Sequence, residues 1–165
     1  MSLNWYPGHM HKASKEMIEV LPMVNLVVEV LDARIPFSSS NPFIQNLCTD
    51  KPRIKILNKC DLADPAITKI WQDYYEQQDN TKTMALDLQH SDPSKQVIDL
   101  INKLVPQKEG RNTLVMVTGI PNVGKSSLIN SLAGRHIAKT GNEPAITKGQ
   151  PVSYTHLTLP TNREV

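Results

Sequence analysis

The sequence of 165 residues lacks the features that mark several large classes of protein. No apolar run reaches the roughly 20 residues needed to cross a bilayer, and the N-terminus has no signal-peptide pattern. The two cysteines, Cys48 and Cys60, have neither metal-site nor disulfide spacing, so we expect reduced thiols. A net charge of +2 is too small to indicate nucleic-acid binding by itself. We therefore expect one cytoplasmic domain, long enough to bury a core.

The sequence also has no internal repeat and no low-complexity tract; short apolar runs alternate with amphipathic segments. β-branched apolar runs predict strands at residues 26–31, 52–57, 81–86 and 113–118. Apolar residues at helical spacing predict helices at about 9–21 and 41–49, after Asp64, after Asp92 and at 127–133. This alternation predicts an α/β fold, a doubly wound and mostly parallel sheet with right-handed crossovers.

Three of the predicted helices carry an apolar stripe that we expect to face the core. Two of them start with an aspartate cap followed by proline, a frequent first helical residue. The expected inward residues are Met10, Ala13, Met17 and Leu21 in the first helix, Ile67, Ile70, Trp71 and Tyr74 in the helix after Asp64, and Val97, Ile98, Ile101, Leu104 and Val105 in the helix after Asp92.

Residues 119–126, GIPNVGKS, match the G-x-x-x-x-G-K-[ST] pattern of a phosphate-binding loop. A predicted strand precedes the loop and a predicted helix follows it, which favours this interpretation over a glycine turn that merely caps a helix. Glycines let backbone N–H groups turn toward phosphates, and the helix adds its positive end. Lys125 is expected to reach the β- and γ-phosphates, and the Ser126 hydroxyl to ligate Mg²⁺. The expected nucleotide contacts are Gly119, Pro121, Asn122, Val123, Gly124, Lys125, Ser126 and Ser127.

A second motif, Asn58-Lys59-Cys60-Asp61, has the N-K-x-D pattern by which GTPases recognise guanine. It follows a predicted strand, and ligands of open α/β sheets bind at that end of the strands. The Asp61 carboxylate can accept two N–H bonds from guanine, a pair that adenine does not offer. Asn58 would hold the loop or the base, and the stem of Lys59 would pack over the ring. Alone, the tetrapeptide also fits an exposed polar turn; with a phosphate loop it predicts binding of GTP and GDP.

The guanine box precedes the phosphate loop, the reverse of the order in ordinary GTPases. With NWYPGHM at 4–10, DARIP at 32–36 and PAIT at 144–147, the motifs resemble the YlqF/RbgA-type circularly permuted GTPases over about residues 3–150. The resemblance implies a P-loop GTPase fold in permuted order and GTP hydrolysis. It also implies assembly of the large ribosomal subunit, with that subunit and its rRNA as partners and neither membrane nor DNA. Ala145 stands where the family usually has glycine, which could stiffen switch I.

The same resemblance suggests further site residues, each with an alternative. Thr147 is placed to be the switch I threonine that binds Mg²⁺ and the γ-phosphate, or it is a solvated loop residue. His9 could orient the attacking water, because the family lacks the usual catalytic glutamine, or it could cap a helix or contact RNA. Asn122 could ligate K⁺ or only stabilise its own loop. Residues 83–85 are a weak candidate for the second guanine contact, and a plain strand end explains them equally well.

Two questions about activity stay open at this point. Asp32 ends an apolar strand and could be the Walker B aspartate of a P-loop ATPase, although the family has its own DARIP loop there. No aspartate follows Asp99, so the chain has no D-x-x-G segment of switch II. We expect a permuted GTPase domain at 1–150 without switch II, and a non-native tail at 151–165. Such a chain would hold nucleotide with little or no turnover, and residues 152–159 could cover the apolar edge left on the strand at 113–117.

Overall fold

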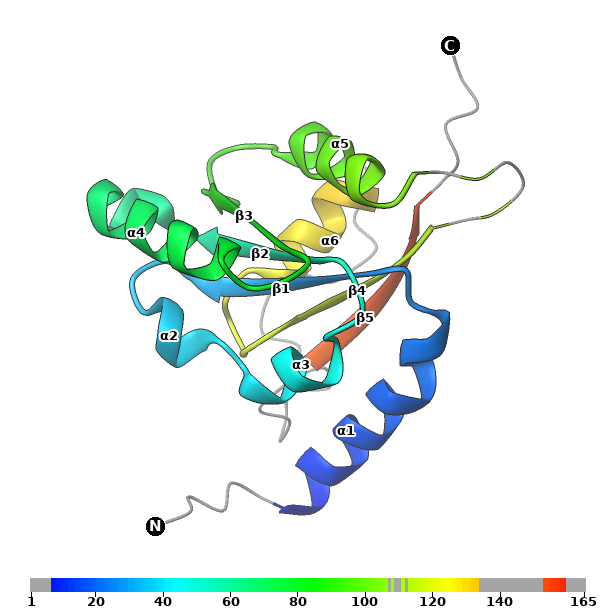
Figure 1. Ribbon diagram of the computed structural model, residues 1–165. Coiled ribbons are helices and arrows are strands. Elements are labelled where there is room, and N and C mark those ends of the chain that lie inside the picture. The colour runs from blue at the N-terminus through cyan, green and yellow to red at the C-terminus, as the bar shows by residue number, and fades with distance from the viewer. Residues whose placement is uncertain (1–6, 107, 109–110, 112, 134–152, 160–165) are drawn as a thin grey trace.

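The protein is described by a computed structural model over residues 7–106, 108, 111, 113–133 and 153–159, with the backbone alone at 7–13 and 153–159. Its centre is a five-stranded sheet in the order β3-β2-β1-β4-β5 (Figure 1). The first four strands along the chain are parallel, and β5 is antiparallel to β4. Each parallel strand matches its prediction to within one residue at either end. The strands are β1 (Leu26–Asp32), β2 (Arg53–Asn58), β3 (Thr81–Leu86), β4 (Thr113–Gly119) and β5 (Ser153–Leu159).

Helices cover both faces of this sheet, as a doubly wound fold requires (Figure 1). Helices α5 and α6 cover one face, where Val97 and Leu128 join the buried strand residues Val28 and Ile54. Helices α1 and α3 cover the other face, where Met17 packs with the strand residues of a second buried cluster. The helices are α1 (Pro7–Val20), α2 (Pro36–Ser39), α3 (Pro42–Leu47), α4 (Pro65–Glu76), α5 (Ser94–Leu104) and α6 (Lys125–Ala133), with the short 3₁₀ helices η1 (Leu21–Met23) and η2 (Cys60–Leu62).

Strand β1 lies between β2 and β4, and all seven of its residues are buried. A strand covered on both faces loses the alternation of apolar and polar residues, which explains its almost continuous apolar run. This strand also pairs with the phosphate-loop strand β4, with Leu26 opposite Val115 and Val30 opposite Gly119.

The start of α4 and the inward stripe of α5 agree with the sequence, whereas α5 itself begins at Ser94, with Pro93 and not Asp92 at the capping position. The Asp64 carboxylate accepts hydrogen bonds from the first-turn N–H groups of Ala66, at 2.8 Å, and Ile67, at 3.3 Å, so it caps α4 as predicted. In α5, Val97 and Ile101 are fully buried, and the other three predicted residues of that stripe pack against the same cluster. In α1, Met17 is buried, while the side chains of Met10 and Ala13 lie outside the described residues.

The inward stripe predicted for α4 was wrong at three of its four residues; the fourth, Trp71, is partly buried, with its ring centre 6.3 Å from that of Phe37 and 5.7 Å from that of Tyr75. Ile67, Ile70 and Tyr74 are 50%, 62% and 48% exposed, and the buried residues are instead Thr68 and Tyr75. The helix is therefore turned by about one residue, which is roughly 100°. It packs beside the edge strand β3 through polar contacts, with the Gln72 amide donating to Thr83 Oγ1 at 3.2 Å. A helix over a sheet edge covers little apolar surface, so its longest apolar stripe stays at the surface.

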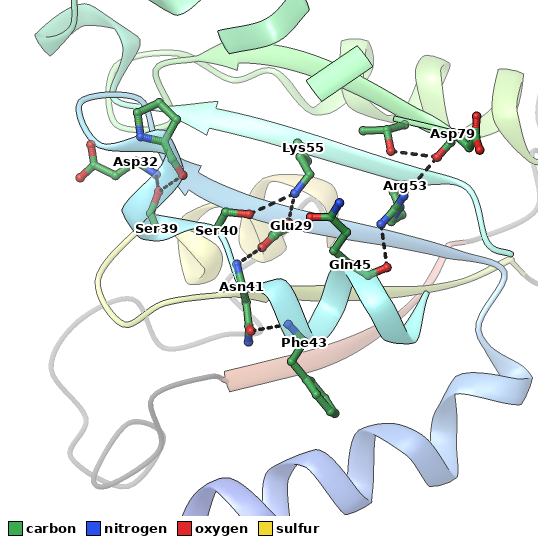
Figure 2. Close-up of polar contacts among 12 residues, drawn as sticks. Glu29, Asp32, Ser39, Ser40, Asn41, Phe43, Gln45, Arg53, Lys55 and Asp79 are labelled. Atoms are coloured by element: carbon green, nitrogen blue, oxygen red, sulfur yellow. Dashed lines mark hydrogen bonds and ion pairs between the residues drawn. The ribbon is translucent and has the colours of Figure 1, made fainter. Parts of the chain in front are cut away.

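A buried ion pair interrupts the apolar face beneath α2 and α3 (Figure 2). Glu29 of β1 and Lys55 of β2 are register partners, and their side chains are 5% and 1% exposed. The Lys55 ammonium donates to Glu29 and, at 3.3 Å, to Ser40 Oγ, and it lies 4.7 Å from the centre of the Tyr75 ring. The second Glu29 oxygen accepts the backbone N–H of Asn41 at 2.8 Å. The pair thus fixes the loop between α2 and α3 to the centre of the sheet.

Strand β5 covers the outer edge of the phosphate-loop strand, as the sequence suggested residues 152–159 could do. Ser153 pairs with Gly119 and Leu159 with Thr113. Because β5 runs antiparallel, its first residue lies beside the phosphate loop and its last lies at the opposite end of the sheet. The boundary at residue 150 stays a prediction.

None of the helices in the described part of the chain is long and apolar enough to span a membrane. Cys48 and Cys60 are free thiols. Burial raises the pKa of Cys48 to about 11, and it also raises that of Cys60, so both favour the protonated, unreactive form.

Candidate nucleotide-binding site

The two motifs meet at one edge of the sheet, where β1, β2 and β4 end. Asp32 pairs with Asn58 in the β1–β2 register, and Val30 pairs with Gly119 in the β1–β4 register. The guanine box and the phosphate loop therefore leave the sheet from the carboxyl ends of parallel strands. This is the edge at which open α/β sheets bind ligands.

The two glycines of the phosphate loop occupy positions with no room for a side chain. A Cβ on Gly119 would lie 2.6 Å from the Val30 carbonyl oxygen. A Cβ on Gly124 would lie 2.3 Å from Asn58 Nδ2, and its φ of +114° is itself strained for other residues. Helix α6 starts at Lys125, two residues earlier than predicted, so its N–H-bearing first turn faces the end of the loop.

Lys125 lies inside the loop. Its ammonium donates to the carbonyl oxygens of Gly119, at 3.0 Å, and Ile120, at 2.7 Å. Burial lowers the pKa of Lys125 to about 8, because the loss of solvation disfavours the charged ammonium, and no carboxylate among the described residues offsets this loss. An anionic phosphate would supply the charge that this site lacks.

Asn58 joins the guanine box to the phosphate loop. Its side-chain Nδ2 donates to the Val123 carbonyl at 2.7 Å, and its Oδ1 accepts the Leu88 N–H at 3.0 Å. Both ends of the amide are thus used within the protein. Of the two roles expected for Asn58, holding the loop or holding the base, the geometry supports the first. The contact with Leu88 was not anticipated, although residues after β3 belong to the same edge.

Lys59 also connects the guanine box to the phosphate loop, at the surface of the protein. Its backbone is left-handed, with φ of 62°, and its ammonium lies 3.3 Å from the Asn122 carbonyl, to which it donates. Asn122 is itself left-handed, with φ of 61°. The stem of Lys59 therefore runs from the guanine box toward the phosphate loop, the course expected of a side chain that covers a base.

Asp61 lies on η2, directly after the carboxyl end of β2, and its side chain is exposed. Ligand atoms of Asp61, Asp87 and His90 lie within 4.8 Å of one another, and His90 Nδ1 is 2.8 Å from Asp87. The candidate for the second guanine contact, residues 83–85, lies within β3, where the Thr83 hydroxyl donates to Glu76 at 3.0 Å. Asp87 and His90, which follow β3 in the sequence, thus lie beside Asp61.

Asp32, the candidate Walker B aspartate, is held by its neighbour Arg34. The guanidinium donates to its two oxygens at 3.0 and 2.8 Å, and this contact is the main reason that the pKa of Asp32 lies below its ordinary value.

Thr147 lies outside the described residues, and of His9 only the backbone, in the first turn of α1, is described. Their expected roles stay predictions.

The fold and the site define a P-loop GTPase domain in circularly permuted order. Residues 114–159 match the family described as 50S ribosome-binding GTPase. The chain is 43% identical over 160 residues to Ribosome biogenesis GTPase A of Priestia megaterium, covering 91% of this chain and 55% of that protein. It is 37% identical to the protein of that name from Thermotoga maritima (89% and 52% covered), and 39% identical to Mitochondrial ribosome-associated GTPase 1 of Mus musculus (87% and 48%). The chain belongs to the YlqF/RbgA-type GTPases, and it spans about half the length of these relatives.

Proposed function

We propose that this domain binds GTP and GDP, and that in the whole protein GTP hydrolysis is coupled to assembly of the large ribosomal subunit in the cytoplasm. The observation that carries the nucleotide part is the bond from Asn58 to the Val123 carbonyl, which fixes the guanine box against the phosphate loop. The ribosomal part rests on the names of the relatives and of the matched family. The large subunit and its rRNA are the proposed partners.

Each group at the edge then has a distinct task. Lys125 and the N-terminus of α6 neutralise the β- and γ-phosphates. Asp61 accepts the two N–H bonds of guanine, and the Lys59 stem covers the ring. Ser127, with residues 121–123, completes the wall around the phosphates.

The residues also fit the metal ion that GTPases use. Ser126 lies in the first turn of α6 and offers a hard hydroxyl oxygen, which is the ligand type Mg²⁺ prefers. We propose Ser126 and Thr147 as its protein ligands, and the side chain of Asn122, exposed at the tip of the loop, as a ligand for K⁺. When bound, these cations would supply positive charge next to the phosphates.

For hydrolysis, His9 and Thr147 are the proposed catalytic residues together with Lys125. A second candidate function is nucleotide binding without turnover, and one observation favours it for this chain: no aspartate follows Asp99, so no D-x-x-G segment is present. Intact GTPases without activators turn over at on the order of 10⁻⁴ to 10⁻² per second. We expect this chain to fall below that range; steady turnover lost in Lys125→Ala would contradict the binding-only function.

Competition between nucleotides tests the proposal directly. A fluorescent GDP analogue bound to the full chain should be displaced by GTP and GDP but not by ATP, and Lys125→Ala should abolish its binding. Displacement by ATP as strong as by GTP would support the ATPase alternative with Asp32 as a metal ligand. Co-sedimentation with purified large ribosomal subunits, with and without nucleotide, tests the proposed partner separately.

A further inference from the structure

The DARIP segment at 32–36 continues β1 alongside the guanine box. Asp32 is the register partner of Asn58, and the Ala33 N–H donates to the Asn58 carbonyl at 2.8 Å. The first residue of the guanine box is therefore bonded through its backbone to the segment that carries Asp32 and Arg34. Any charge fixed on this segment has a fixed position relative to the guanine box.

The Asp32 carboxylate is such a charge. The Arg34 backbone N–H and Nε donate to one oxygen, at 2.9 and 3.0 Å, and Arg34 Nη2 donates to the other at 2.8 Å. The Asp32 backbone N–H donates to Ser39 Oγ at 3.0 Å, as Figure 2 shows, so the residue is also held from the α2 side. Its side chain is 8% exposed. Asp32 thus presents a nearly buried carboxylate that cannot change rotamer without losing several hydrogen bonds.

Lys59 places its ammonium beside this carboxylate. Its Nζ lies 3.7 Å from Asp32 Oδ2 while it donates to the Asn122 carbonyl of the phosphate loop. Within the described part of the chain, Asp32 is the carboxylate that forms an ion pair with Lys59. A lysine has four rotatable side-chain bonds, so an ion pair at its tip fixes the course of the whole stem.

We propose that Asp32 is a positioning residue for guanine-nucleotide binding: its fixed carboxylate holds the Lys59 ammonium against the phosphate loop, so that the Lys59 stem lies ready over the base. Arg34 orients the Asp32 carboxylate. The negative charge of this carboxylate therefore interacts with both Arg34 and Lys59. In this arrangement Asp32 acts through Lys59 and is not a metal ligand. The inference rests on the proposed binding of guanine nucleotide.

A double-mutant cycle between Asp32 and Lys59 tests it, with a fluorescent GDP analogue titrated into the full chain. Asp32→Asn should weaken binding about threefold to fivefold, the range of a partly exposed ion pair. In the Lys59→Met background the same change should have no effect, because the stem no longer carries an ammonium. A merely structural role for Asp32 would weaken binding equally in both backgrounds and would overturn the inference. Should Asp32→Asn fail to fold by circular dichroism, Asp32→Glu, which displaces the charge, replaces it with the same expected outcomes.

Asp73→Asn is the matched control, because it removes an exposed carboxylate of α4 that pairs with Lys69, away from the guanine box. It should leave binding of the analogue unchanged in both backgrounds. Weakening as large as in Asp32→Asn would show that loss of any negative charge, not the contact with Lys59, matters, and would also overturn the inference. If the unmodified chain does not bind the analogue, the proposed function fails; if it binds and the cycle shows no coupling, only the role of Asp32 fails.

Discussion

A Cβ atom on Gly124 would lie 2.3 Å from the side-chain nitrogen of Asn58, which comes from a strand 66 positions earlier in the sequence. The glycine of one motif thus makes room for the asparagine of the other. That asparagine in turn donates to the Val123 carbonyl next to the glycine. The phosphate loop and the guanine box therefore constrain each other before any nucleotide binds.

The first prediction follows from this contact. Gly124→Ala should destabilise the domain by at least about 1–3 kcal/mol, because it adds backbone strain to the clash, and nucleotide binding should be lost. Urea denaturation and nucleotide titration measure the two effects. The double variant Gly124→Ala/Asn58→Ala removes the clashing amide and should be less destabilised than the sum of the two single variants. Simple additivity would mean that the two residues do not meet.

A second prediction concerns the buried pair of Lys55 and Glu29. Lys55→Met leaves a carboxylate buried without its partner, which costs about 3–5 kcal/mol, whereas Lys55→Met/Glu29→Gln should recover much of the loss. The free energy of unfolding in urea measures both. Lys69→Met is the control, since the ion pair of Lys69 with Asp73 is exposed and its loss should be undetectable. Equal effects at Lys55 and Lys69 would contradict the burial of the first pair.

A third prediction concerns base recognition. Asp61→Asn replaces one acceptor by a donor facing guanine, and an unpaired polar group costs about 1–3 kcal/mol, so GTP affinity should fall about tenfold or more. Xanthine nucleotides should bind better in exchange, because their 2-oxo group accepts the new N–H. Competition titrations with both nucleotides measure the switch. Asp73→Asn, on the exposed surface of α4, should change neither affinity. Unchanged GTP affinity in Asp61→Asn would remove the assignment of the guanine box.

The pH dependence of binding gives a fourth prediction. The pKa of Lys125 is about 8 in the nucleotide-free protein, and phosphate would raise it. Binding should therefore be strongest below pH 8 and weaken as the pH rises above it, with proton uptake near pH 8 to 9. Calorimetry of GDP in buffers of different ionisation enthalpy measures that uptake. GMP has no β-phosphate for Lys125 to contact, so GMP should bind without proton uptake. Proton release, or equal uptake with GMP, would contradict the role of Lys125.

The same pKa shift makes the folding stability depend on pH in the opposite direction to nucleotide binding. Because burial lowers the pKa of Lys125 below its value in the unfolded chain, the protonated lysine costs stability below pH 8. That cost should disappear as the pH rises from about 8 to about 10.5, the ordinary value. The phosphate loop thus holds a destabilising charge that its ligand would compensate.

The sequence by itself determined the parallel strands, most of the helices and the two motifs, because each depends on local patterns. The run of apolar residues in β1, the Asp64 cap and the glycines of the phosphate loop all follow from backbone geometry and from the spacing of side chains. The family could be inferred for the same reason, since its motifs are short contiguous segments in an unusual order.

Only the tertiary structure decided which groups meet and which apolar residues stay exposed. Asn58 reaches Val123, and Asp32 reaches Lys59, because parallel strands bring their carboxyl ends to one edge. The α4 stripe with Ile70 is exposed although its spacing is that of a core helix, because α4 packs over an edge strand. A helical period shows that a helix has an apolar face; which face becomes buried depends on the surface that the rest of the chain provides.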